Sequence, residues 1–287
     1  LLGANLDPNY GCAGLNSVAY GLINQELERG DSGLRSFVSV QSGLVMWPIA
    51  EYGSEEQKNF WLPKMARGET IGCFGLTEPD FGSNPEGMIT RAAKRGSEYV
   101  LNGTKMWITN AGFAQLFTVF AKINGEKLTA FLVERGYPGV KFGGEEKKMG
   151  IKASSTRMVI FEDAKVPVEN VLGEIGKGHK IAFNVLNVGR YKLGAGAIGG
   201  AKQALAISAK YAKEREAFGR PIARFGLIQQ KLAEMASRSF AAESAIYRTM
   251  GLIDEALESK TGAAAVLAGA RIELARSVAT KPIRAPE

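Results

Sequence analysis

Cysteine and histidine are nearly absent from this chain, which has two cysteines and one histidine among 287 residues. Two cysteines, Cys12 and Cys73, cannot form a disulfide framework, and their scarcity favours a reducing compartment. A single histidine argues against a zinc site and against a nucleophile activated by histidine. We interpret that histidine, His179, as structural.

Long apolar runs and blocks of one charge are missing as well. No apolar run approaches the roughly 18 residues that a membrane span needs, and residues 1–8 lack the basic-then-apolar layout of a signal peptide. The net charge of +7 comes from 36 basic and 29 acidic residues, which are dispersed along the chain. Nucleic-acid binding is therefore disfavoured, whereas an anionic small molecule fits this charge equally well. The chain is expected to be soluble and unprocessed, with no membrane span.

The first of three zones, residues 17–67, has a helical pattern. Val18, Leu22 and Leu27 recur at helix spacing, and Ser17 is a candidate N-cap. Residues 54–57 (Ser-Glu-Glu-Gln) are typical of a capping box that opens a second helix, which Pro63 is predicted to stop.

The second zone, residues 71–172, has a strand pattern. Asn102-Gly103 lies between the β-rich runs 99–101 and 106–108, and Asn124-Gly125 lies between the runs 116–123 and 128–133. Asn-Gly between such runs predicts a hairpin in each case. A further run at residues 158–161 follows, and Val166-Pro167 then breaks the pattern. This zone is predicted to be a compact antiparallel sheet or barrel.

The third zone returns to helix from about residue 178, with helical stretches at 179–193 and beyond, 201–216 and 225–257. Segregation of helices from strands predicts an α+β fold and not alternating β-α-β units. The expected domains are an N-terminal helical domain (1–69), a middle antiparallel β-barrel (70–175) and a C-terminal helical bundle (176–287).

Residues 194–199 match the dinucleotide-binding pattern G-x-G-x-x-G. That pattern requires a strand before it and a helix that opens at it, whereas the residues on both sides are helical in pattern. We interpret these small residues as a place where two helices approach closely. A nicotinamide-dependent enzyme remains the alternative.

Residues 73–83 (CFGLTEPDFGS) and 105–110 (KMWITN) are the most informative segments. Both combine apolar strand residues with small hydroxyl or glycine positions. This combination suits a flat aromatic ligand that lies against a sheet while N–H groups and hydroxyls bind its polar edge.

Six stretches in order resemble signatures of the acyl-CoA dehydrogenase family: 52–57, 76–79, 107–110, 148–151, 166–173 and 215–219. The resemblance covers nearly the whole chain. It implies that FAD is the cofactor and that an acyl-CoA thioester loses its α-proton while its β-hydride passes to flavin N5. It also implies electron-transferring flavoprotein as acceptor, a homo-oligomer (a dimer of dimers), and the bacterial cytoplasm or the mitochondrial matrix as the location.

The same resemblance assigns roles to individual residues. The expected cofactor-binding residues are Phe74, Leu76, Thr77, Gly82, Ser83, Trp107, Thr109, Arg215 and Phe218. Ser83 and Arg190 are expected to contact coenzyme A, and Arg215 with Phe218 is expected to reach the FAD of a second copy. Core packing of the aromatic residues, strand propensity of the threonines and ordinary helix-end arginines are the alternative interpretations. Asn84 departs from the aspartate that is usual in the family.

The two halves of the chain give different predictions for the acyl group of the substrate. Residues 10–42 are most similar to glutaryl-CoA dehydrogenases and place Glu28, Arg35 and Ser36 where that subfamily binds a distal carboxylate. Residues 146–154 and 225–229 are closer to very-long-chain acyl-CoA dehydrogenases. We favour glutaryl-CoA, because an arginine in an acyl pocket disfavours a long hydrocarbon tail. Pairing of Arg35 with Glu28 or Asp31 is the alternative.

The family's catalytic base, a glutamate in an aromatic-Glu-Gly-Thr motif, has no match in the printed sequence. We therefore expect a fragment, or a protein with segments removed, that binds flavin poorly and turns over little or nothing. A non-catalytic acyl-CoA or flavin-binding relative and an acyl-CoA oxidase are the competing functions.

Overall fold

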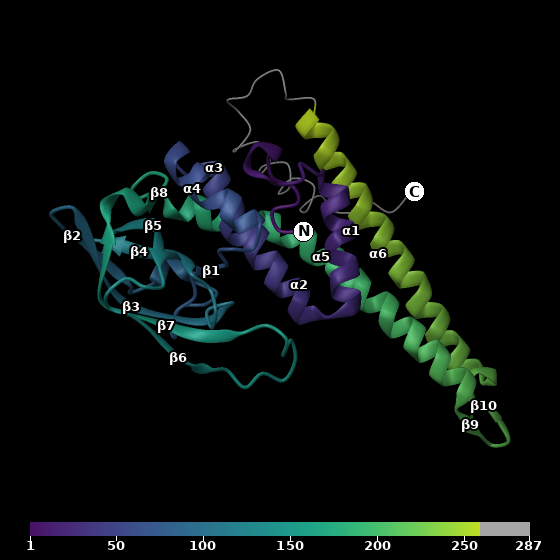
Figure 1. Cartoon of the computed structure of the whole chain (residues 1–287). Coiled ribbons are helices and arrows are strands. Elements are labelled where there is room, and N and C mark those ends of the chain that lie inside the picture. Colours follow the sequence, from purple (N-terminus) through teal and green to yellow (C-terminus); the bar gives the residue numbers. More distant parts are fainter. Residues whose placement is uncertain (259–287) are drawn as a thin grey trace. The chain divides into compact units, whose positions relative to one another are not determined.

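The computed structural model describes residues 1–258. Contacts divide the chain into two compact units, one made of residues 1–15 and 36–189 and the other of residues 16–35 and the chain from residue 190 onward. Figure 1 shows the elements of both units, and two helices, α2 (Ser32–Ser39) and α5 (Gly178–Glu214), contribute to both. The predicted C-terminal bundle extends to Glu287, and its part after residue 258 lies outside the described residues.

The helices that lie wholly in the first unit are short. They are η1 (Pro8–Tyr10), the π-helix η2 (Val40–Met46), α3 (Trp47–Tyr52), α4 (Glu55–Ala66), η3 (Pro85–Gly87) and η4 (Val168–Asn170). The predicted capping box is confirmed, because Ser54 Oγ accepts from the Gln57 N–H at 3.2 Å while Gln57 Oε1 accepts from the Ser54 N–H at 3.1 Å. The prediction that Pro63 ends this helix is wrong. Burial of Leu62 and Met65 on either side of Pro63 offsets the hydrogen bond that proline removes.

Eight strands of the first unit form one sheet. They are β1 (Gly72–Gly75), β2 (Arg91–Arg95), β3 (Glu98–Thr109), β4 (Leu116–Ile123), β5 (Lys127–Glu134), β6 (Val140–Glu145), β7 (Thr156–Pro167) and β8 (Val171–Leu172). The strand order is β6-β7-β3-β2-β4-β5-β8, with β1 also paired to β4.

This sheet is mixed, and it is not the closed antiparallel barrel that the sequence predicted. Both β1 and β2 run parallel to β4: residues 72–75 pair with residues 116–119, and Arg91 and Ala92 pair with Lys122 and Ile123. The chain therefore leaves β4 after Gly75 and returns to it in the same direction at Arg91. Residues 76–90 form the excursion between the two parallel pairings. The pattern of apolar residues in the sequence does not indicate that the chain returns to β4.

One of the two predicted hairpins is confirmed. Asn124 and Gly125, with φ of 53° and 79°, connect the antiparallel strands β4 and β5. The hairpin predicted at Asn102-Gly103 is wrong, because β3 runs through both residues as a single strand. A register shift against β7 lies there, where Gly103 adopts φ of 150°, so Asn-Gly marks a bulge instead of a turn.

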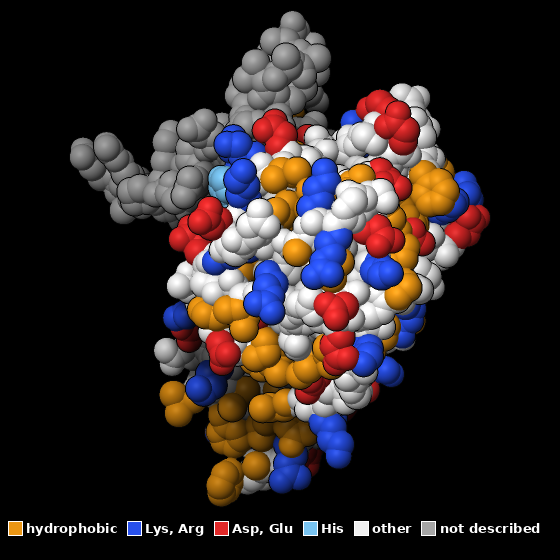
Figure 2. Space-filling view, turned by 90° about the vertical axis from the view of Figure 1, so that its left-hand side faces the viewer, with side chains coloured by type: hydrophobic (Ala, Val, Ile, Leu, Met, Phe, Trp, Pro, Cys, Tyr) orange, Lys and Arg blue, Asp and Glu red, His pale blue; other side chains and the backbone are white. Residues whose placement is uncertain are grey.

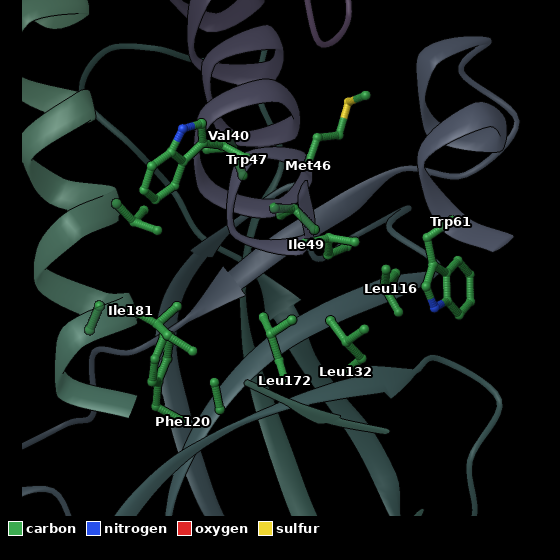
Figure 3. Packing of buried hydrophobic residues seen from close by; sticks show 14 of the residues in the cluster. Val40, Met46, Trp47, Ile49, Trp61, Leu116, Phe120, Leu132, Leu172 and Ile181 are labelled. Carbon is green, nitrogen blue, oxygen red and sulfur yellow. The ribbon is translucent and has the colours of Figure 1, made fainter. Parts of the chain in front are cut away.

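The sheet is covered on both faces at its central strand β4. Leu116 and Phe120 point into one apolar cluster, whereas Phe117 and Val119 point into the other. The first cluster joins the sheet to the helices through Trp47, Ile49, Trp61 and Ile181, as Figure 3 shows. Burial on both faces explains why β4 is apolar almost throughout and not alternating.

The second unit contains α1 (Ser17–Gly30), the ends of α2 and α5, the hairpin of β9 (Glu216–Ala217) and β10 (Arg220–Pro221), η5 (Ile222–Arg224) and α6 (Gly226–Glu258). Helices α1 and α6 contact each other through Asp254, which accepts from the N–H groups of Ser17 and Val18 at 2.8 and 3.1 Å. The stretches predicted at 179–193 and 201–216 form one helix, α5.

The glycines at residues 194–199 lie inside α5, so the nicotinamide-binding alternative is wrong and the close-approach interpretation is confirmed. A Cβ at Gly199 would lie 2.0 Å from the carbonyl oxygen of Gln25 on α1. A Cβ at Gly194 would lie 3.2 Å from Ile246 Cδ1 on α6. Small residues let the three helices pack at short range.

Within residues 1–258, every helix is too short or too polar to cross a membrane. On the face drawn in Figure 2, Lys and Arg side chains are interspersed with Asp and Glu side chains.

Candidate functional site

Strands β1 and β3, together with the residues that follow β1, are joined side by side by three hydrogen bonds. The Met106 N–H donates to the Thr77 carbonyl at 2.9 Å. The Lys105 ammonium donates to the Leu76 carbonyl at 3.2 Å, and the Asn110 amide donates to the Gly72 carbonyl at 3.2 Å. The two segments that the sequence singles out, 73–83 and 105–110, thus form one continuous surface.

Trp107 stands on an irregular part of β3. The register of β3 against β7 shifts between Lys105 and Ile108, and Trp107 adopts φ of 57°, in the left-handed region that bulky residues rarely enter. The shift turns the indole outward, with 60% of Trp107 exposed, whereas Ile108 is buried. Trp107 is thus an aromatic side chain that remains accessible to a flat group.

Two threonines, Thr77 and Thr109, lie on the segments joined at Met106. Thr77 and Thr109 are half-buried, and within the described part of the chain neither side chain has a hydrogen-bond partner. Both hydroxyls are therefore able to bind the polar edge of a ligand. Phe74 is half-buried and packs edge-on against Phe120 at 5.1 Å, so one side of its ring belongs to the core. Leu76 is buried.

Glu78 and Lys105 form a buried ion pair directly behind this surface. The Lys105 ammonium lies 2.7 Å from Glu78 Oε1, and the two side chains are 0% and 1% exposed. The carboxylate also accepts from the N–H groups of Ile89 at 2.7 Å and Thr90 at 3.1 Å. Burial alone raises the pKa of Glu78, but the Lys105 charge and these hydrogen bonds together bring that pKa below its ordinary value.

The exposed residues Gly82 and Ser83 lie on the excursion between β1 and β2. A tight turn precedes them, since Glu78 and Phe81 exchange both backbone hydrogen bonds at 3.1 and 3.2 Å. A Cβ at Gly82 would meet no atom within 4 Å, so a bound group can approach this backbone from outside. Asn84 is exposed beside them.

Three of the residues expected to bind FAD or coenzyme A belong to the second unit. Arg215 is exposed at the end of α5, and Phe218 is 96% exposed at the tip of the β9–β10 hairpin, with φ of 53°. The Phe218 ring packs edge-on against Phe225 at 6.2 Å, and Arg220 lies 4.3 Å over the Phe225 ring. Arg190 is exposed on α5. His179 is exposed at the start of the same helix.

Two of the residues expected at the acyl end, Glu28 on α1 and Arg35 on α2, belong to one polar cluster. Arg35 makes an ion pair with Glu28, whose other oxygen accepts from the Ser32 hydroxyl at 2.5 Å. The alternative interpretation, that Arg35 pairs with Glu28, is thus confirmed. Asp31 instead caps α2, because its carboxylate accepts from the N–H groups of residues 33 and 34. Ser36 is half-buried and lies in the first unit.

Lys192 on α5 completes this cluster and was not expected from the sequence. It is buried, and burial together with the nearby Arg35 charge lowers the pKa of Lys192 to about 7. Glu78 and Lys105 were also given no role, although both lie in the quoted segments. The alternation of buried and less buried residues along β3 could have indicated that Lys105 is buried, because Lys105 lies on the same face of the strand as Tyr99 and Leu101.

Comparison with known families matches the chain to three consecutive descriptions: "Acyl-CoA dehydrogenase, N-terminal domain" over residues 1–69, "Acyl-CoA dehydrogenase, middle domain" over residues 73–164, and "Acyl-CoA dehydrogenase, C-terminal domain" over residues 176–281. A probable acyl-CoA dehydrogenase of Bacillus subtilis is 49% identical over 263 residues, which are 91% of this chain and 44% of that protein.

Two solved structures share the fold. The acyl-CoA dehydrogenase of Bacillus anthracis, crystallised with FAD, superimposes with a TM-score of 0.89 at 49% identity and covers 97% of this chain and 47% of its own. A glutaryl-CoA dehydrogenase of Mycobacterium smegmatis, in complex with FADH2, gives a TM-score of 0.84 at 40% identity over 97% of this chain and 71% of its own. This chain therefore spans less than half the length of the two Bacillus relatives.

Proposed function

Because this chain belongs to the acyl-CoA dehydrogenase family, we propose that the protein is an FAD-dependent acyl-CoA dehydrogenase and that Thr77, Trp107 and Thr109 line the flavin site. The observation that carries this proposal is the outward-facing Trp107 beside two hydroxyls that are not used within the described protein. The residues present fit the cofactor: an aromatic wall for a tricyclic ring, and hydroxyls for its polar edge.

FAD, when bound, supplies the acceptor for the β-hydride of the acyl thioester. The chain's own contribution is orientation. Trp107 covers one face of the ring and excludes water from it, Thr109 binds near the reactive nitrogen, and Thr77 binds the pyrimidine edge. Phe74 and Leu76 complete the apolar wall.

The remaining expected residues keep their proposed roles. Gly82 and Ser83 contact the flavin diphosphate and coenzyme A, and Arg190 contacts coenzyme A. Arg215 and Phe218 bind the FAD of a second copy, because an arginine fork suits a diphosphate. This assembly is a dimer of dimers in the bacterial cytoplasm or the mitochondrial matrix and passes electrons to electron-transferring flavoprotein. The predicted domain limits at 69/70 and 175/176 are part of the same proposal.

We place glutaryl-CoA ahead of a long-chain thioester as substrate, with Glu28, Arg35 and Ser36 at the acyl end. Support comes from the polar character of this cluster, in which Arg35 is paired with Glu28 and the buried Lys192 lies near the Arg35 charge. Such polar surroundings disfavour a long hydrocarbon tail.

Anaerobic titration tests the function. The purified chain, supplied with FAD, is titrated with glutaryl-CoA and with palmitoyl-CoA while the flavin absorbance is followed. We expect added FAD to bind weakly, with glutaryl-CoA as the more effective of the two ligands in perturbing the flavin band. Bleaching by glutaryl-CoA establishes dehydrogenation by this chain, whereas a shifted but unbleached band shows binding without turnover, the result expected where the family's glutamate is missing. A protein that never binds FAD would refute the assignment.

A further inference from the structure

The Glu78–Lys105 pair lies where the pairing along β4 passes from β1 to β2. The chain leaves β4 after Gly75 and rejoins it at Arg91. Glu78 lies at the start of this excursion, and its carboxylate accepts from the N–H groups of residues 89 and 90 at the end of it. Lys105 comes from β3. One ion pair therefore joins three segments that are separate in the sequence.

The pair also lies next to the residues of the proposed flavin wall. Thr77 directly precedes Glu78, Trp107 follows Lys105 by two positions, and the Met106–Thr77 hydrogen bond lies between them. The Lys105 side chain also passes close to β1, since a Cβ at Gly75 would lie 3.4 Å from the Lys105 Cγ. The pair is therefore linked to the two segments that carry Thr77 and Trp107.

Stability gives no reason for charges at this position. Removing a lysine and a glutamate from water costs much of what their attraction returns, and apolar replacements of similar size are often as stable. What a buried pair supplies is a single geometry, because a misplaced partner leaves a buried charge unsatisfied. The pair is thus suited to fixing register.

We infer that Lys105 and Glu78 are positioning residues that set the distance between Thr77 and Trp107 across the flavin site. This inference rests on the proposed function. Neither side chain touches the ligand in this account, since both are buried behind the surface.

The experiment compares Glu78→Gln, Lys105→Met and the double variant Glu78→Gln with Lys105→Met. The double variant removes both charges, so no buried charge is left unpaired, and the amide oxygen still offers an acceptor to the N–H groups of residues 89 and 90. The matched control is Lys141→Met, which breaks the exposed Lys141–Glu162 pair on β6 and β7 of the same sheet. Two readouts are taken: hydrogen exchange at the Met106 and Ile89 amides without ligand, and the affinity and band shape of added FAD.

For the double variant we expect unfolding stability close to wild type, exchange at Met106 and Ile89 faster by about tenfold or more, and FAD affinity lower by about tenfold or more with an altered flavin band. The control should change none of these. Unchanged exchange and an unchanged flavin band in the double variant would overturn the positioning role. If exchange accelerates but the wild-type chain binds no FAD, the proposed function fails while the register-fixing role of the pair stands.

Discussion

The N–H of Met106 lies 2.9 Å from the carbonyl oxygen of Thr77, and this bond joins the two segments that carry the candidate site. The next residue, Trp107, adopts a left-handed backbone and is exposed. The backbone bond therefore ties the segment that carries Thr77 to the segment that carries an exposed aromatic side chain. In the proposed flavin site, this bond would set the spacing of the two residues before the ligand binds.

Trp107 should be nearly dispensable for folding. Trp107→Ala is expected to change the free energy of unfolding by less than about 1 kcal/mol, because the side chain is largely exposed. Trp61→Ala, in the core, is expected to cost about 3–5 kcal/mol. Urea unfolding followed by circular dichroism compares the two, and equal losses would mean that Trp107 is a core residue.

The contact between α5 and α1 requires a glycine at position 199. Gly199→Ala should destabilise the second unit by about 1–3 kcal/mol, since the new methyl group meets the Gln25 carbonyl. Gly251→Ala on α6 is the control, because nothing lies within 4 Å of its Cβ position. There alanine should raise stability, by up to about 1 kcal/mol. Thermal melts of both variants decide, and a tolerated Gly199→Ala would disprove the close approach.

Lys192 should make stability depend on pH in the alkaline range. Its folded pKa of about 7 lies below the value of about 10.4 for an unfolded lysine. Between these pH values the unfolded chain holds more protons, so the free energy of unfolding should rise with pH, by up to about 1.4 kcal/mol per unit. Lys192→Met should remove this rise. The exposed Lys210 on the same helix provides the control variant, Lys210→Met, which should retain it.

Arg215 is proposed to serve the flavin site of a second copy, and mixing experiments test this. Thr77→Val and Arg215→Ala should each weaken FAD binding by about tenfold or more, with little loss of stability because Arg215 is exposed. When the two variants are mixed and allowed to exchange subunits, one site of each mixed pair regains both wild-type residues. Random exchange of equal amounts makes about half of the pairs mixed, so binding titration should recover about a quarter of all sites. No recovery would place Arg215 outside the flavin site of a partner.

Local signals predicted much of the fold. The capping box at Ser54 and the turn at Asn124-Gly125 each depend on a few neighbouring residues, and both are present. The predictions were wrong where residues far apart in the chain determine the local structure. Asn102-Gly103 has the same local signal as a turn, but β7 continues past it and pairs on both sides of it. Pro63 remains helical because of the core around it.

The candidate site likewise has residues that the sequence predicted and residues that it did not. Thr77 and Trp107 were identified from motif similarity, but alternation alone would place Trp107 on a regular strand and hide its bulge. The importance of Lys105 could be suspected only from its place on a buried face, and its partner Glu78 lies 27 positions earlier in the chain. Pairings across such separations depend on the return of β2 to β4, which local patterns do not encode.

Quenching of tryptophan fluorescence by FAD tests the central claim most directly. The chain has three tryptophans, of which Trp47 and Trp61 are buried in the core and Trp107 is exposed. Added FAD should quench a large part of the emission of the wild-type chain, and this part should disappear in Trp107→Phe while a phenyl ring still covers the site. Quenching of equal size in wild type and Trp107→Phe would show that the flavin binds elsewhere.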